Sequence, residues 1–240
     1  MDLQNDNPPG LYGKVTSHGD FITRRLPPLF VNAWDNWLQH GIAASRSHMS
    51  KQWLEIYLTS PIWRFALAPG VIGDTGWTGV WMPSVDKVGR HFPLTLASEV
   101  VGECRIYEWL RDAKNWYENL EDLALSSLEE GFRFDEMDAK LQSMPGLQAM
   151  MLAINRLPDI QGGKNMAVCY SWHEFSQLEE ALPMLNLELA QMTLRDHSFW
   201  WTEGSQRVHP SLSVCRGMPS AEQFCAMLDG AWVERGWQWR

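Results

Sequence analysis

Three residues near position 90 are the types that perform hydrolytic chemistry. Residues 83–94, PSVDKVGRHFPL, contain Ser84, Asp86 and His91. In a catalytic triad, a histidine takes the proton of a serine hydroxyl, and a carboxylate orients the histidine. That chemistry requires the side chains to lie within hydrogen-bond reach in an open cleft, which spacing along the chain does not establish. We therefore carry a small hydrolase or phosphatase-like enzyme as one hypothesis.

A purely structural role for these residues is the alternative to this hypothesis. An aspartate two positions after a serine commonly closes a turn by accepting a backbone N–H, and His91 beside Phe92 and Pro93 is typical of a packed residue. A second polar group has the same two interpretations, and it consists of Ser17, His18 and Asp20. For both groups the pattern favours loop shaping over catalysis.

Other motifs of enzyme and cofactor sites are incomplete in this chain. No serine has glycine on both sides at the spacing of the G-x-S-x-G elbow. WHEFSQ begins like the zinc motif H-E-x-x-H but has Gln177 in place of the second histidine. GDTGWTG and QGGKN lack the full patterns of dinucleotide and phosphate loops. The sequence thus predicts no catalytic residues, no cofactor and no metal.

The four cysteines point the same way. Cys104, Cys169, Cys215 and Cys225 form no C-x-x-C pair and lie in mostly apolar segments. In a reducing compartment this pattern is typical of buried thiols, and it argues against a zinc site.

Charge and composition restrict the partners. The chain of 240 residues carries a net charge of −9 and is 45% hydrophobic, which predicts a folded protein without the basic surface that nucleic acid requires. The N-terminal sequence MDLQNDNPPG lacks the basic start and apolar run of a signal peptide, and no apolar stretch is long enough to span a bilayer. We expect a cytoplasmic protein without membrane insertion.

Hydrophobic periodicity predicts the elements that position these residues. We expect strands at 11–15, 62–68, 78–84, 92–100, 166–172, 198–204 and 210–217. We expect helices at about 30–41, 52–58, 105–130, 135–144, 146–155, 174–185 and 219–230. The segment with Ser84, Asp86 and His91 then connects two paired strands, with Gly89 free to adopt a positive φ at its bend.

The grouping of these elements predicts an α+β fold. Its central sheet should be largely antiparallel or mixed, with helices packed on its faces. We expect residues 1–9 to be a flexible tail and residues 10–240 one domain, with a weak boundary near 161–163.

Four blocks of the sequence carry a family resemblance. GKVTSHGDFITRRLP, WLEIYLTSPIWRFAL, GVWMPSVDKVGRHFPL and FWWTEGS resemble the signature blocks of the TagF (ImpM) family of type VI secretion-associated proteins. The resemblance implies a cytoplasmic accessory protein, not an enzyme, that restrains assembly or firing of the secretion machine after translation. It also implies a partner, the forkhead-associated scaffold protein of the same system.

The candidate partner-binding or loop-shaping residues come from these signature blocks. They are Asp20, Arg25, Asp86 and Arg90, which pair carboxylates with nearby cations. Such pairs fix a loop internally or face a partner. We expect Asp86 and Arg90 to lie near each other or near Asp20 and Arg25.

Overall fold

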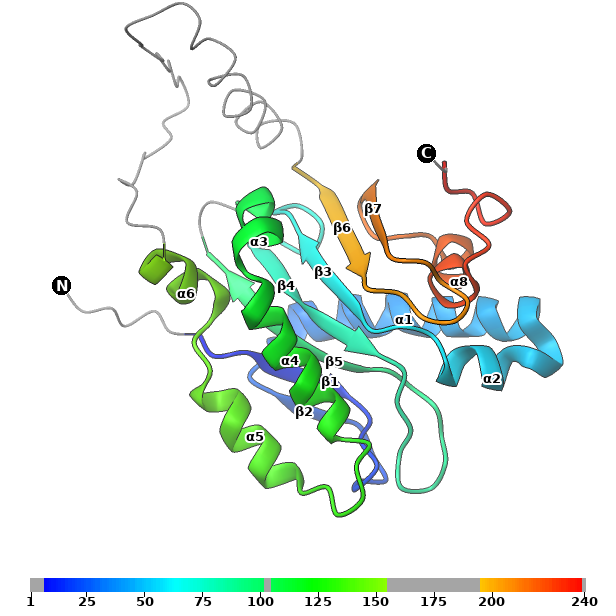
Figure 1. The fold of residues 1–240 in the computed structure, drawn as a ribbon, viewed down its shortest axis with the longest axis horizontal. Coiled ribbons are helices and arrows are strands. Elements are labelled where there is room, and N and C mark those ends of the chain that lie inside the picture. Colours follow the sequence, from blue (N-terminus) through cyan, green and yellow to red (C-terminus); the bar gives the residue numbers. More distant parts are fainter. Residues whose placement is uncertain (1–6, 102–104, 155–194, 239–240) are drawn as a thin grey trace, which may run out of the picture.

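A seven-stranded antiparallel sheet forms the centre of the molecule (Figure 1). The computed structural model describes residues 7–101, 105–154 and 195–238. The strand order is β2-β1-β5-β4-β3-β6-β7, and every neighbouring pair is antiparallel. The predicted α+β class and the antiparallel sheet are confirmed.

The strand bounds follow the predicted apolar runs closely, except for β2, which was not predicted from the sequence. They are β1 Gly10–Gly13, β2 Ile22–Arg24, β3 Trp63–Leu67, β4 Gly76–Met82, β5 Leu94–Val100, β6 His197–Thr202 and β7 Ser211–Arg216. The central strands β3 and β4 are buried along their whole length. Strands buried throughout need cover on both faces of the sheet, which the helices supply.

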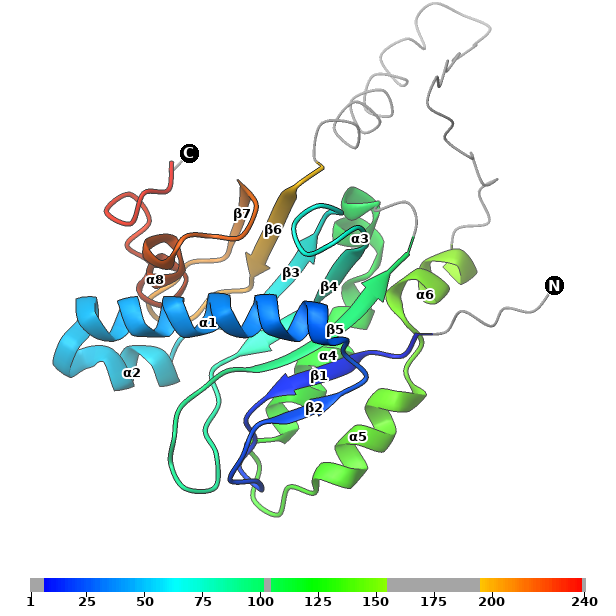
Figure 2. The same ribbon diagram turned by 180° about the vertical axis from the view of Figure 1, so that it is seen from behind.

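Helices α1, α2 and α8 cover one face, where α1 crosses the sheet (Figure 2). Their bounds are α1 Pro28–Met49, α2 Trp53–Leu58 and α8 Ala221–Asp229, and a 3₁₀ turn, η1 Ser50–Gln52, joins α1 to α2. The side chain of Ser220 caps α8 by accepting from the backbone of Gln223, and Gly230 ends the helix at a φ of 75°.

Indole rings fill the core beneath these helices. Trp34 of α1 lies 4.5 Å from Phe65 and 5.9 Å from Trp200 between ring centroids. Trp34 donates its indole N–H to Thr95, and Trp63 donates to the carbonyl of Met227. Such rings combine a large apolar area with one polar group that needs a partner when buried. The tryptophans of this region are therefore mainly a core feature.

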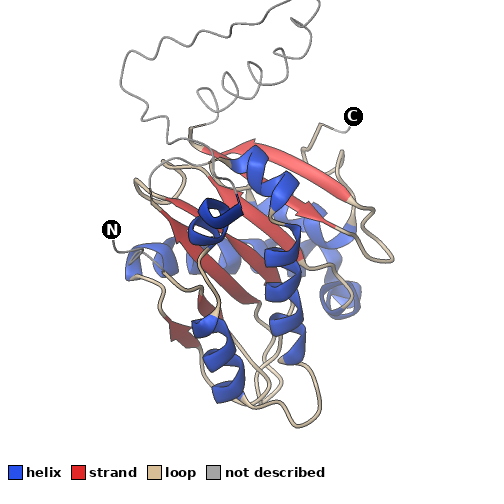
Figure 3. Cartoon of the chain, turned by 60° about the vertical axis from the view of Figure 1, so that its left-hand side comes forward, coloured by secondary structure: helices blue, strands red, loops and turns tan. Residues whose placement is uncertain are grey.

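Helices α3 to α6 cover the opposite face, as the secondary-structure colouring shows (Figure 3). Their bounds are α3 Ile106–Asp112, α4 Lys114–Ser126, α5 Phe134–Ser143 and α6 Leu147–Ile154. Aliphatic side chains dominate the strand surface here, including Leu11, Val80, Met82 and Leu96. The period of two along each strand thus separates an aromatic face from an aliphatic one.

Two helix predictions differ from the structure. The first helix continues beyond Gly41 to Met49, because Gly41 is where α1 passes close to α8. A Cβ on Gly41 would lie 2.4 Å from the ring of Phe224. The helix expected over 105–130 is two helices, because Ala113, at φ −96° and ψ 15°, interrupts it between α3 and α4.

Some predictions fall on residues outside the described ranges. They are most of the tail at 1–9, the boundary near 161–163, the strand at 166–172, the helix at 174–185, and the thiols of Cys104 and Cys169. Within the described ranges, no helix has the length and apolar character needed to cross a membrane.

Candidate functional site

Two loops meet at one end of the sheet and hold most of the predicted site residues. One loop, residues 14–21, joins β1 to β2, and the other, residues 83–93, joins β4 to β5. Figures 1 and 2 both show the two connections side by side beyond the ends of β1 and β5. We call them the paired loops.

Asp86 is the centre of the paired loops. Its side chain is fully removed from solvent. One oxygen, Oδ2, accepts from Lys14 Nζ at 2.8 Å and from Arg90 Nε at 2.7 Å. The other, Oδ1, accepts from the backbone N–H groups of Val88 at 3.0 Å and Arg90 at 2.8 Å. Both carboxylate oxygens are thus used within the protein.

These contacts determine the charge of Asp86. Removal from water by itself raises the pKa of a carboxyl group. Here the hydrogen bonds from Lys14, Arg90 and the backbone outweigh that effect and hold the pKa of Asp86 well below its usual range. Asp86 is therefore an ionised anchor for two cations, and it is a poor proton acceptor.

Further hydrogen bonds join one loop to the other. Lys87 donates its backbone N–H to the carbonyl of His18 at 2.9 Å. Ser84 donates its hydroxyl to the carbonyl of Lys14 at 2.8 Å, and Arg90 Nη2 donates to the carbonyl of Gly19. Gly89 takes a φ of 84° at the bend, as the sequence predicts. The two loops therefore form one unit.

The four predicted charged residues divide into two groups. Arg90 lies between the carboxylates of Asp86, at 2.7 Å, and Asp20, at 3.7 Å. Arg25 lies apart from them and pairs with Asp138 of α5 at 2.6 Å. Arg25, just before α1, thus links to the opposite helical layer. The expectation that Asp86 and Arg90 lie near each other is confirmed, with Asp20 beside Arg90 and Arg25 apart.

Ser84, Asp86 and His91 are close in sequence but are used separately. Ser84 is 1% exposed, and Tyr57 both accepts from its N–H and donates to its carbonyl at 3.1 Å. The ring of His91 packs edge-on against Trp53 and Tyr57 at 5.9 Å. Among the described residues, no hydrogen bond joins His91 to Ser84 or Asp86. In this geometry the three side chains shape a loop and are not assembled as a triad.

An aromatic platform borders the buried charges. Phe21 stacks on Tyr12 at 5.7 Å and meets the edge of Phe92 at 4.8 Å, while Lys14 Nζ lies 5.1 Å above the Phe21 ring. Tyr12 in turn donates to Asp35 of α1 at 2.5 Å. Burial and the carboxylate of Asp35 raise the pKa of Tyr12, so it stays a neutral donor. Contacts with Tyr12 and Phe92 therefore hold the ring of Phe21 in place.

Sequence reasoning missed Lys14, Tyr57 and Tyr12 as parts of this unit. Lys14 is only 6% exposed, and a lysine is rarely so buried unless it has a charged partner. The available signal in the sequence was its position directly after an apolar strand. Tyr57 lies on α2, whose contact with residue 84 depends on the tertiary fold. Local spacing carries no trace of such a contact.

The paired loops offer no free set of metal ligands among the described residues. The group of three His, Cys, Asp or Glu side chains with converging donor atoms lies elsewhere, at His48, Glu222 and Cys225.

Comparisons with known proteins place the chain in a family. The family model of the TagF N-terminal domain, described as type VI secretion system-associated, matches residues 10–144, which include both paired loops. The crystal structure of PA0076 from Pseudomonas aeruginosa PAO1 matches with a TM-score of 0.76 and 35% sequence identity. The match covers 92% of this chain and 94% of that chain. No curated protein matches the chain. The chain belongs to the TagF family of type VI secretion system-associated proteins.

Proposed function

We propose that this protein is a cytoplasmic negative regulator that restrains assembly or firing of the type VI secretion system after translation, without catalysis. It acts by binding another protein, and the partner implied by the family resemblance is the forkhead-associated scaffold protein of that system. Membership of the TagF family supports the link to secretion. The paired loops support binding as the mode of action.

The observation that carries the proposal is the contrast between buried charge and exposed apolar groups on the paired loops. The carboxylate of Asp86 is enclosed by Lys14 and Arg90, yet Phe21 is 47% exposed and Val88 is 67% exposed. A loop whose charged groups pair with one another within the protein holds its shape before it meets a partner. Less conformational entropy is then lost on binding.

Phe21 and Val88 are suited to anchor an interface. Aromatic side chains on rigid support dominate many protein–protein contacts. Asp20, whose side chain is fully exposed, and Arg90, at 57% exposed, add charge of both signs beside them. Charges at the rim of an interface mainly select partners and orient them.

The test measures capture of the scaffold by the full-length protein. Phe21→Ala and Val88→Asp should each weaken binding by about tenfold or more, since the loss of an interface hot spot costs about 2 kcal/mol and about 1.4 kcal/mol is already tenfold. Val233→Asp is the matched control, because Val233 is 65% exposed and lies far along the chain, after α8. Each variant is also tested for repression of secretion in cells.

Two outcomes would overturn the proposal. One is Phe21→Ala and Val88→Asp proteins that bind the scaffold and repress secretion like the wild type. The other is turnover of ester or phosphoester substrates that is lost in Ser84→Ala, which would support the hydrolase alternative using Ser84, Asp86 and His91.

A further inference from the structure

Three side chains with metal-binding chemistry converge where α1 meets α8. His48 lies in the last turn of α1, and Glu222 and Cys225 lie three residues apart on α8. An imidazole nitrogen, a carboxylate oxygen and the cysteine sulfur all lie within 4.8 Å of one another. We call these residues the α1–α8 cluster. It is separate from the paired loops and from the function proposed above.

The fold holds the three donors together through helix packing. Gly41 lets α1 approach the ring of Phe224, one of the two residues between Glu222 and Cys225 in α8. Residues three apart on a helix project from the same face, so Glu222 and Cys225 both reach the side of α8 that faces His48. His48 Nε2 already lies 2.8 Å from the Glu222 carboxylate.

We propose that the α1–α8 cluster binds one Zn²⁺ ion through His48, Glu222 and Cys225. Imidazole, thiolate and carboxylate are the ligands that zinc takes in proteins. Ligand atoms around a tetrahedral zinc lie about 3.3–3.8 Å apart, given metal–ligand distances of about 2.0–2.3 Å. The donor atoms now lie within 4.8 Å of one another, so binding requires the exposed His48 and Glu222 side chains to move towards Cys225.

The proton balance of binding is simple. A neutral imidazole and an ionised carboxylate bind a metal without losing a proton, whereas a cysteine thiol releases one proton to solvent as the sulfur bonds to the metal. Burial raises the pKa of Cys225 to about 11, so the metal-free protein carries a thiol. No oxidant or other reactant is needed.

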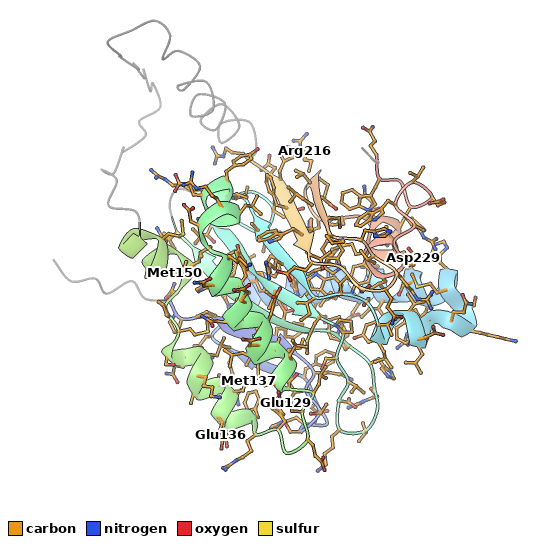
Figure 4. All side chains as sticks on the ribbon, viewed as in Figure 1. Glu129, Glu136, Met137, Met150, Arg216 and Asp229 are labelled. Carbon is orange, nitrogen blue, oxygen red and sulfur yellow. The ribbon has the colours of Figure 1, made fainter. Side chains whose placement is uncertain are left out.

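The surroundings leave a fourth position open. A surface hollow of about 560 Å³ is lined by His48, Glu222 and Glu234, whereas Cys225 is buried and does not line it. Water or the Glu234 carboxylate can complete the coordination from this side. The cation of Arg235 lies nearby but pairs at 3.0 Å with Asp229, which is labelled in Figure 4. That pairing limits its repulsion of a metal ion.

The binding test uses the full-length protein, reduced and stripped of metal with a chelator. Zn²⁺ titration against a chromophoric competitor should show one tight site per chain. His48→Gln and Glu222→Gln should each weaken that site at least about 100-fold, because even the loss of an outer-shell partner weakens metal binding 10- to 100-fold. His40→Gln, an exposed histidine on the same helix, should leave the affinity unchanged.

Cobalt identifies the sulfur ligand. Co²⁺ bound at the cluster should give a sulfur-to-cobalt charge-transfer band that disappears in Cys225→Ser and persists in Cys215→Ser. Zn²⁺ should also raise the Tm of the wild type and of Cys215→Ser, and leave the Tm of His48→Gln unchanged. The proposal fails if the His48 and Glu222 variants bind Zn²⁺ like the wild type, or if the charge-transfer band survives in Cys225→Ser. It also fails if the wild type binds no Zn²⁺, in which case His48 and Glu222 form only a surface ion pair.

Discussion

The paired loops and the α1–α8 cluster are two polar regions built on opposite plans. In the paired loops, Asp86 is fully buried and both of its oxygens accept hydrogen bonds from the same chain. In the α1–α8 cluster, the His48 and Glu222 side chains are 37% and 55% exposed and contact only each other closely. A buried carboxylate whose oxygens all accept hydrogen bonds serves structure, whereas the cluster places two exposed donors, His48 and Glu222, beside the buried thiol of Cys225.

This difference teaches how to judge the two sets of residues. The triad types Ser84, Asp86 and His91 suggest chemistry, but each has its polar groups or ring engaged by the fold. His48, Glu222 and Cys225 form no sequence motif, yet their donor atoms converge. Residue type alone therefore does not identify a functional site. The deciding feature is whether the polar atoms are already used by contacts within the protein.

The largest effect is expected for Asp86→Ala, which tests whether the buried carboxylate organises the paired loops. Removing the carboxylate leaves the Lys14 ammonium, on a side chain 7% exposed, and two backbone N–H groups without their acceptor. Breaking a buried pair from one side leaves an uncompensated charge, which is strongly destabilising. We expect the largest fall in Tm of any substitution in the two regions, measured by calorimetry.

Asp86→Asn is the control, because it keeps one acceptor oxygen while removing the charge. Its fall in Tm should be smaller than that of Asp86→Ala. A Tm of Asp86→Ala equal to the wild type would show that the carboxylate does not organise the loops.

The second test uses pH. The folded-state pKa of Asp86 is depressed, so its contribution to stability is fully present above the unfolded-state value of about 3.9 and is lost as the pH falls below it. Wild-type stability in chemical denaturation should therefore decline below about pH 4 more steeply than that of Asp86→Asn. Parallel pH profiles for the two proteins would refute this assignment.

Arg90→Ala should have an intermediate effect. Arg90 shares Asp86 with Lys14 and its side chain is 57% exposed, so water screens the pair and replaces much of the interaction. We expect a loss of about 1 kcal/mol in the free energy of unfolding. Amide hydrogen exchange should increase in residues 14–21 and 83–93, because Arg90 ties one loop to the other.

Lys87→Ala provides the comparison for Arg90, since Lys87 joins the loops through its backbone N–H, which alanine retains. Equal exchange in the two variants would argue that the Arg90 side chain has no role in holding the loops together.

Much of the fold was predictable because the spacing of apolar residues along the chain indicates strands and helices locally. The adjacent residues Trp200 and Trp201 show this, since alternation sends Trp200 into the aromatic core and Trp201 towards Tyr117 on the other face. The length of α1 was not predictable, because Gly41 reads as a stop signal until the ring of Phe224 is placed against it. Tertiary packing overrides local propensity at that position.

The site was predictable to a lesser degree for the same reason. The contact of Arg90 with Asp86 joins residues four positions apart. It was predictable because Pro83 and Gly89 shape the loop and charges of opposite sign alternate within it. The contact of Lys14 with Asp86 joins residues 72 positions apart, and that of His48 with Glu222 joins residues 174 positions apart. Only the sheet order and the packing of α1 on α8 bring those partners together.

The smallest expected effect is that of Glu222→Gln in metal-free protein. Glu222 is more than half exposed, and its contact with His48 lies at the surface, where even fully charged pairs contribute about 0–1 kcal/mol. Gln223 and Ser220 supply the capping box of α8 without Glu222, so the helix start survives the change. We expect a change of less than about 1 kcal/mol in the free energy of unfolding by urea. A larger loss would mean that the cluster is a structural ion pair after all, and that the open plan which separates it from the paired loops does not hold.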